Sequence, residues 1–148
     1  MNTSLPNKVF WKDSSYWLAL LAGPVVWCLL YTAGNGVGAP PIPWEMFLKI
    51  AMLSPLLEEI VFRGGLQTLL LEGAFFTKRK FGISAANIVT SLVFAAAHLI
   101  YQTPMWACLV FFPSIIFGWA RERYNSVIPS ILLHAFYNAG FGLLFVQL

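Results

Sequence analysis

Residues 54–67 read SPLLEEIVFRGGLQ, which places two adjacent carboxylates, Glu58 and Glu59, inside an otherwise apolar segment. The chain of 148 residues is 59% hydrophobic and only 10% charged, whereas a soluble domain is about 25% charged. A soluble protein of this size could not cover so much apolar surface, so the surrounding solvent must be lipid. The sequence therefore predicts an all-α polytopic membrane helical bundle, with residues 1–148 forming a single integral membrane domain.

Five segments are long and apolar enough to be membrane spans, which need about 20 residues each. They are residues 16–33, 44–71, 84–101, 104–120 and 127–146. The Gly- and Pro-rich run 34–43 separates the first two and is predicted to be a loop. The first span is long for the apolar part of a signal peptide, and no small-residue cleavage site follows it, so we expect it to be retained.

Basic residues occur before the first span and after the second and fourth, and the other connections have none. Because Lys and Arg stay on the cytoplasmic side, this alternation predicts a cytoplasmic N-terminus and a C-terminus outside, in a bacterial plasma membrane. The net charge of +3 is too small and too scattered to indicate a nucleic-acid partner. The basic residues in question are Lys8, Lys12, Lys78, Arg79, Lys80, Arg121 and Arg123.

Few ionisable groups remain inside the predicted spans, and each costs at least about 2.5–3.5 kcal/mol at mid-membrane. Residues four apart share a helix face, so Glu59 is expected to pair with Arg63. Glu58 points about 100° away around the axis and has no cation at helical spacing. We therefore expect Glu58 to be available for a partner on another helix. The set comprises Glu58, Glu59, Arg63, His98 and His134, with Asn138 four residues after His134.

Three spans thus present polar faces, and the economical arrangement points all of them at one central site. The third span has Asn87, Ser91 and His98 near one stripe, and the fifth has Ser130 one turn before His134.

The sequence also predicts the surroundings of several small and aromatic residues. Gly64 and Gly65 should let a neighbouring backbone approach closely. Cys28 and Cys108 are expected to be buried as small apolar residues. The tryptophans, among them Trp27, Trp106 and Trp119, are expected to face lipid or the membrane interface.

The residue inventory excludes the better-known intramembrane proteases. Asp13 is the only aspartate, so there is no aspartyl dyad, and no HExxH zinc motif occurs. The only G-x-S stretch begins at Gly82, in a predicted cytoplasmic connection. What remains is carboxylate, imidazole and amide, a set that can hydrolyse a peptide bond. A buried carboxylate can deprotonate water, and N–H groups can stabilise the resulting oxyanion.

Three motifs together resemble the CPBP family of CAAX-prenyl-protease-like, or Abi, intramembrane glutamic endopeptidases. They are Glu58-Glu59-x-x-x-Arg63, Phe94-x-x-x-His98 and His134-x-x-x-Asn138, in family order on three predicted helices. The resemblance implies that Glu58 activates water, that His98 holds and polarises it, and that His134 and Asn138 stabilise the oxyanion. Glu59 and Arg63 would support the site, and the catalytic core would span residues 45–146.

The resemblance also bears on the substrate, a membrane-anchored protein or peptide in the lipid bilayer. Many members of that family have about eight spans, whereas five are predicted here. Short members resemble proteases that process C-terminal sorting signals.

Two other functions remain open from the sequence. A non-catalytic immunity or scaffold protein would keep the polar cluster for binding alone. A small transporter or proton relay would also use buried Glu and His, although there is no inverted repeat. For the enzyme, a metal could be held by Glu58, His98 and His134. Because Asn is a poor zinc ligand, a site without metal or other cofactor is favoured.

Overall fold

The computed structural model describes residues 9–33 and 42–145, and this part of the chain is almost entirely helical. A short antiparallel hairpin lies between the helices, formed by β1 (Arg79–Lys80) and β2 (Ile83–Ser84). The helices are a 3₁₀ turn η1 (Phe10–Lys12), then α1 (Ser14–Thr32), α2 (Trp44–Leu48), α3 (Ser54–Glu59), α4 (Thr68–Leu70), α5 (Ala85–His98), α6 (Pro104–Leu109), α7 (Phe111–Tyr124) and α8 (Ile128–Phe145), with π-helical η2 (Lys49–Leu53) and η3 (Ile60–Gln67).

The helical segments correspond to the five predicted spans. α2, η2, α3, η3 and α4 follow one another without a break, and we call this run from Trp44 to Leu70 the central rod. α6 and α7 are likewise separated only by Val110. Residues 34–41 of the predicted loop, and Val146 at the end of the fifth span, lie outside the described residues.

Three helices in the described residues are long and apolar enough to cross a membrane: Ser14–Thr32, Pro104–Tyr124 and Ile128–Phe145. The apolar helix Ala85–His98 is shorter. The predicted fold class is therefore confirmed, and the chain is an all-α integral membrane bundle. Its outer surface agrees with this, because large apolar side chains such as Leu18, Leu29 and Phe112 are exposed.

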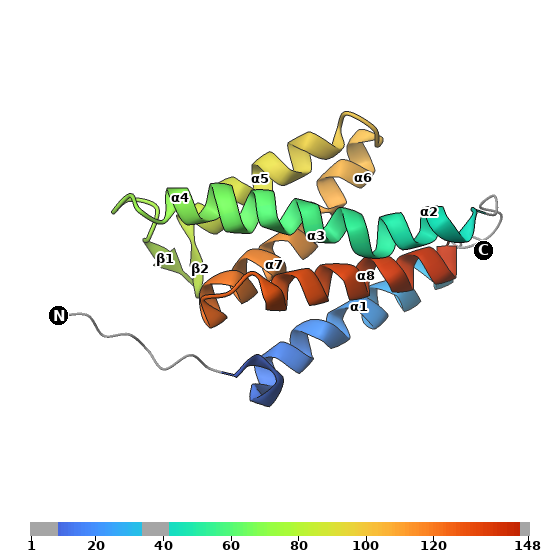
Figure 1. Cartoon of the computed structure of the whole chain (residues 1–148), viewed down its shortest axis with the longest axis horizontal. Coiled ribbons are helices and arrows are strands. Elements are labelled where there is room, and N and C mark those ends of the chain that lie inside the picture. The colour runs from blue at the N-terminus through green and yellow to red at the C-terminus, as the bar shows by residue number, and fades with distance from the viewer. Residues whose placement is uncertain (1–8, 34–41, 146–148) are drawn as a thin grey trace.

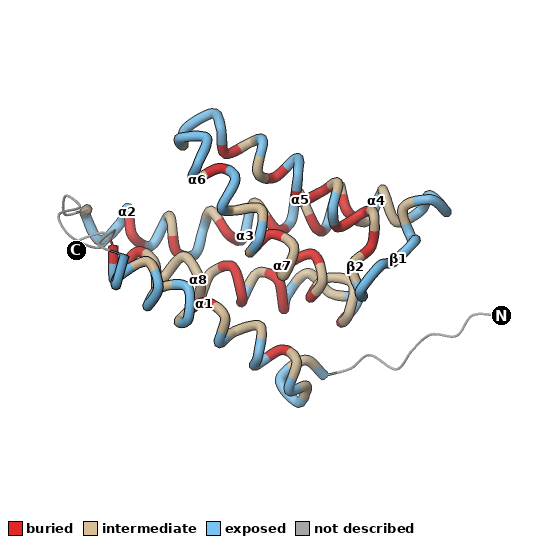
Figure 2. Tube along the Cα trace, turned by 180° about the vertical axis from the view of Figure 1, so that it is seen from behind, coloured by how far each residue is buried: buried red, intermediate tan, exposed pale blue. Residues whose placement is uncertain are grey.

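The central rod, α5, α7 and α8 pack around one another, and α1 lies along the outside of α8 (Figure 1). Buried positions concentrate where these four face each other, whereas α1 is largely exposed (Figure 2). One core cluster joins the start of α1 to α7 and α8 through Tyr16, Phe117, Tyr124 and Leu133.

The basic connections gather at one end of the bundle (Figure 1). There Arg123 Nε lies 2.8 Å from Asp13 Oδ2, and Arg79 Nη2 lies 2.8 Å from Glu122 Oε2. Such a gathering is what an alternating topology requires. The assignment of this end to the cytoplasm stays a prediction.

The expectation that a neighbouring backbone approaches Gly64 and Gly65 closely was wrong. Gly64 and Gly65 are exposed and have no close neighbour. The close approaches occur instead at Gly118, where a Cβ would overlap the Asn87 amide, and at Gly140, where it would overlap the Trp27 ring.

Cys28 and Cys108 are exposed rather than buried. In lipid a small apolar side chain loses nothing by facing outward, so the preference for burial known from soluble proteins does not apply.

Substitution of Gly118 by Ala is expected to destabilise the bundle by about 1–3 kcal/mol, because the added methyl group must displace the buried Asn87 side chain. Gly64→Ala is the matched control. Its nearest neighbour would be Val127 Cγ2 at 3.7 Å, an ordinary contact, and the change gains up to about 1 kcal/mol of helix propensity. Thermal unfolding in detergent measures both, and equal effects would contradict the packing described here.

Asp13 caps α1 by accepting a hydrogen bond from the Ser15 N–H at 3.0 Å. The Arg123 guanidinium hydrogen-bonded to it holds the pKa of the Asp13 carboxyl well below its usual range. Its stabilising contribution is therefore complete above the ordinary Asp pKa and is lost as the pH falls through the lowered value. Asp13→Asn keeps a side chain that caps the helix equally well but removes the charge paired with Arg123, which should cost up to about 1 kcal/mol at neutral pH.

The difference between wild type and Asp13→Asn should shrink as the pH is lowered below about 4, because Asp13 of the unfolded wild-type chain then takes up a proton, whereas the folded chain does so only at lower pH. Unfolding midpoints in detergent across this range measure the difference. A difference that stays constant with pH would contradict a role for the Asp13 charge.

Candidate active site

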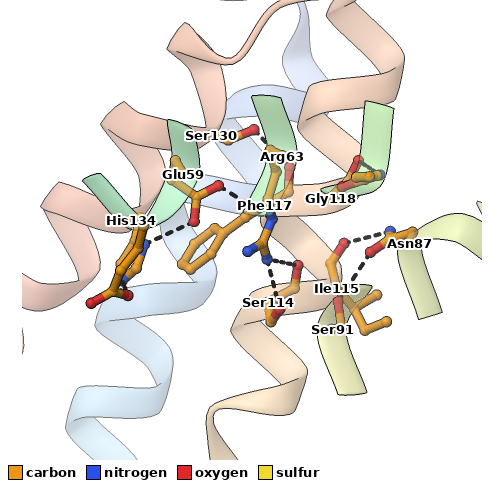
Figure 3. A network of polar contacts seen from close by, with 12 residues as sticks. Glu59, Arg63, Asn87, Ser91, Ser114, Ile115, Phe117, Gly118, Ser130 and His134 are labelled. Carbon is orange, nitrogen blue, oxygen red and sulfur yellow. Dashed lines mark hydrogen bonds and ion pairs between the residues drawn. The ribbon is translucent and has the colours of Figure 1, made fainter. Parts of the chain in front are cut away.

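Glu59 joins two helices at the centre of the bundle (Figure 3). Its side chain is fully buried in α3, and Oε2 lies 3.2 Å from Arg63 Nε one turn later. This is the pair that the sequence spacing predicts. The other oxygen, Oε1, lies 2.9 Å from His134 Nδ1 on α8. The sequence did not indicate this second contact, because it joins residues that lie 75 positions apart.

Arg63 connects the same network to α7. Its guanidinium is completely buried, and Nη2 donates hydrogen bonds to the Ser114 carbonyl at 2.8 Å and hydroxyl at 2.6 Å. The guanidinium also lies 4.9 Å from the centre of the Phe94 ring on α5, in a cation–π contact. A buried cation needs several partners, and here they come from the rod, α5 and α7, although Nη1 has no hydrogen-bond acceptor among the described residues.

Glu58 lies in a different environment from its neighbour. Its side chain is 25% exposed, compared with 0% for Glu59, and it lines a cavity of about 800 Å³. Among the described residues, none is hydrogen-bonded to its Oε2 atom, although that atom is buried. His134 Nε2 lies 3.8 Å from it, too far for a direct hydrogen bond. One glutamate is thus enclosed by protein, and the other faces open space.

The contacts of His134 determine which of its nitrogens reaches the cavity. The Glu59 carboxylate can only accept hydrogen bonds when ionised, so Nδ1 must carry the donated proton. Nε2 then faces Glu58. The ring is held flat against Phe117, with centroids 4.6 Å apart and planes 16° from parallel.

His98 is oriented in a similar way by its own helix. Its Nδ1 lies 2.9 Å from the Phe94 carbonyl, which can only accept, so Nδ1 donates and Nε2 carries no proton in the neutral ring. His98 is 8% exposed and lines the same cavity as Glu58 and His134. It is the last residue of α5, whereas His134 lies in the first half of α8, and the packing of the two helices brings both to one site.

Asn138 is held by a backbone carbonyl that the π-helical winding leaves free. In η2 the Ser54 N–H bonds to Lys49 O, five residues back. The same pattern would pair Ile50 O with Pro55, which has no N–H. Asn138 Nδ2 donates to Ile50 O instead, at 3.1 Å. Such irregular winding is frequent at functional sites, and here it connects the rod to the polar face of α8.

The cavity therefore collects all four residues predicted to be catalytic: Glu58, His98, His134 and Asn138. The rest of its wall is largely aromatic and apolar. Trp27 and Trp106 belong to this wall, so the expectation that they face lipid or the interface was wrong. Tyr137 and Phe141 were not singled out beforehand, although Phe141 follows His134 and Asn138 at helical spacing. The wall includes Trp27, Leu30, Tyr101, Trp106, Phe117, Tyr137 and Phe141.

Three polar residues that were expected to point at the site do not line the cavity. Asn87 Nδ2 donates to the Ile115 carbonyl at 3.0 Å, and Ser91 donates to Asn87 Oδ1 at 3.1 Å. Ser130 donates to the Phe117 carbonyl at 2.7 Å. All three are fully buried; Asn87 joins α5 to α7, Ser130 joins α8 to α7, and Ser91 bonds within α5 (Figure 3). Backbone carbonyls of α7 satisfy Asn87 and Ser130, and sequence spacing cannot predict such acceptors.

Within residues 9–33 and 42–145, no group of three His, Cys, Asp or Glu side chains is arranged to hold a metal ion. In addition, Nδ1 of each histidine is occupied by a protein acceptor.

Comparison with known proteins adds the family. Residues 40–140 match the family described as type II CAAX prenyl endopeptidase Rce1-like. A relative from Escherichia coli, described as an uncharacterized 24.3 kDa protein, is 33% identical over 87 residues. That match covers 59% of this chain and 38% of the relative, so the chain matches well under half of its length. No solved structure shows significant similarity to the chain.

The matched region contains the whole cluster, from Glu58 to Asn138, and covers more than half of the chain. The protein therefore belongs to the Rce1-like family of type II CAAX prenyl endopeptidases.

Proposed function

We propose that the protein is an intramembrane glutamic endopeptidase, which hydrolyses a peptide bond in a membrane-anchored protein with a water molecule activated by Glu58. The observation that carries the proposal is the difference between the adjacent glutamates. Glu59 is enclosed by Arg63 and His134, while Glu58 faces the cavity 3.8 Å from His134 Nε2. Membership of a protease family supports hydrolysis over transport or simple binding.

In the proposed mechanism, Glu58 is the general base and His98 positions the water. Nε2 of neutral His98 can accept a hydrogen bond from the water, because Nδ1 is the donor to Phe94. Glu58 takes a proton from that water as its oxygen attacks the substrate carbonyl carbon. The proton is then given to the amide nitrogen as the C–N bond breaks, which returns Glu58 to its carboxylate form.

The tetrahedral intermediate carries an oxyanion, which needs donors already in place. Asn138 uses one N–H for Ile50 O and has a second to offer. His134 can donate through Nε2 when it is protonated, and the Glu59 carboxylate at 2.9 Å then balances the imidazolium charge. Glu59 is on this proposal a positioning residue for His134, a role beyond its pairing with Arg63.

The apolar cavity wall fits a substrate that is itself in the membrane. With about 800 Å³ and a largely aromatic lining, the cavity can surround an extended apolar segment and limit access of bulk water. We propose a membrane-anchored protein or peptide as substrate, cleaved in a bacterial plasma membrane with the N-terminus of the enzyme on the cytoplasmic side.

The two glutamates should differ sharply in their contribution to stability. Glu59→Gln leaves the Arg63 guanidinium buried without a carboxylate and should cost about 3–5 kcal/mol. Glu58→Gln changes a group that faces the cavity and should stay within about 0.5 kcal/mol of wild type. Thermal unfolding of both purified variants in the same detergent measures this. Similar losses would contradict the division between the neighbours.

Because Glu58→Gln is expected to fold, it tests catalysis directly. We expect it to abolish cleavage of single-span reporter proteins co-expressed with the enzyme, with cleavage read from product bands at equal enzyme levels. Asn138→Ala should lower the rate about 10²–10³-fold, the usual cost of one oxyanion donor. A tight metal chelator should leave wild-type activity unchanged.

If the Glu58→Gln variant cleaved reporters at the same rate as the wild type, the mechanism would be refuted. If the wild type instead cleaves no reporter, and its cellular phenotype survives Glu58→Gln and His98→Ala, the cluster serves an immunity or scaffold function.

A further inference from the structure

The tip of the β1–β2 hairpin has an unfavourable backbone conformation. Arg79 pairs with Ser84 and Lys80 with Ile83, so Phe81 and Gly82 form a two-residue loop. Both have positive φ, 53° and 80°, as in the type I′ turn. That turn strongly prefers Asn-Gly, because Asn tolerates the left-handed region that a bulky side chain avoids. Gly82 suits its position, and Phe81 does not.

Within the described residues, the Phe81 side chain makes no packing contact that would offset the cost of its positive φ. The Phe81 side chain is 93% exposed, the highest value among the large apolar residues. The hairpin is attached to α7, because Arg79 and Ser84 both contact Glu122, and its base is closed by the Ala85 N–H, which donates to Lys78 O at 3.0 Å. The attachment places Phe81 at the outer tip of the hairpin.

Two lysines accompany aromatic rings at this place. Lys80 Nζ lies 5.5 Å from the centre of the Phe81 ring, and Lys78 Nζ lies 5.3 Å from that of Phe75, which is 65% exposed. Arg79 forms an ion pair with Glu122, so its charge is already balanced within the protein. The hairpin thus offers two ammonium groups, each beside an exposed ring.

The position of the hairpin indicates what these groups meet. It connects the end of the central rod to the start of α5, at the end of the bundle (Figure 1). Apolar helices stop here, so this level corresponds to the boundary between hydrocarbon and headgroups. Aromatic rings insert at that boundary, and lysines near it attract anionic lipids.

We propose that the hairpin tip binds anionic phospholipid at the membrane interface. The Phe81 ring would lie among the acyl chains, and the Lys78 and Lys80 ammonium groups would contact the lipid phosphates. The site is independent of the catalytic cavity, and the proposal stands whether or not the protein cleaves peptides. Its occupant is a lipid surface, recognised by negative charge and by an adjoining apolar layer.

The substitution Phe81→Asn separates the local strain from the binding. Asn suits a type I′ turn, so the variant should unfold at a higher temperature than wild type in zwitterionic phosphatidylcholine micelles. In micelles titrated with phosphatidylglycerol, wild type should gain further stability, as expected for a ligand of the folded state. Phe81→Asn should lose most of this additional gain.

Lysine variants test the charge. Lys80→Gln should weaken the apparent phosphatidylglycerol affinity about fivefold, the effect of one lysine near an anionic surface. Lys49→Gln is the matched control, because it removes the same charge from an exposed position in η2, towards the opposite end of the rod, and should retain wild-type affinity.

An anionic-lipid gain that persists in both Phe81→Asn and Lys80→Gln would overturn the proposal. So would an equal loss in Lys49→Gln, which would indicate non-specific attraction to the charged micelle. A wild type with no preference for phosphatidylglycerol over phosphatidylcholine would also refute it, and the exposed ring would then be assigned to a protein partner.

Discussion

The arrangement of this bundle depends on one buried carboxylate. Glu59 holds Arg63 on its own helix and His134 on α8, while Arg63 reaches Ser114 on α7. In a lipid environment little hydrophobic force acts between helices, so packing and polar contacts must set their relative positions. A carboxylate with a cation on one side and an imidazole on the other gives three helices a common reference point. The cavity exists in its present shape because these three helices are held around it.

Local patterns could be predicted from the sequence because they depend on the helix alone. The apolar segments, the gathering of basic connections at one end and the Glu59–Arg63 pair all follow from composition or from a spacing of four. The separation of Glu58 from Glu59 follows from the same geometry. The sequence therefore predicts the fold class and the separate positions of the two glutamates, whereas most of the aromatic cavity wall was missed.

Contacts between helices were not accessible in this way. Nothing in the spacing of residues indicates that Glu59 meets His134, or that Asn87 and Ser130 bond to backbone carbonyls of α7. A buried polar residue in a membrane must find a partner, but a carbonyl on another helix leaves no trace in side-chain identity. Glycines were misjudged for the same reason, since Gly118 matters through Asn87, which is 31 residues earlier in the sequence.

The anchor of Asn138 has a consequence for how the site tolerates sequence change. Its acceptor is the carbonyl of residue 50, which every amino acid carries, so side-chain replacement at Ile50 leaves the acceptor in place. What keeps that carbonyl free is the five-residue winding and the imino acid at position 55. Replacement of the side chain at position 50 thus changes the cavity wall, which Ile50 lines, but leaves the acceptor of Asn138 in place. Insertion or deletion of one residue in η2 would rotate the carbonyl away, so the length of this helix is under tighter constraint than its composition.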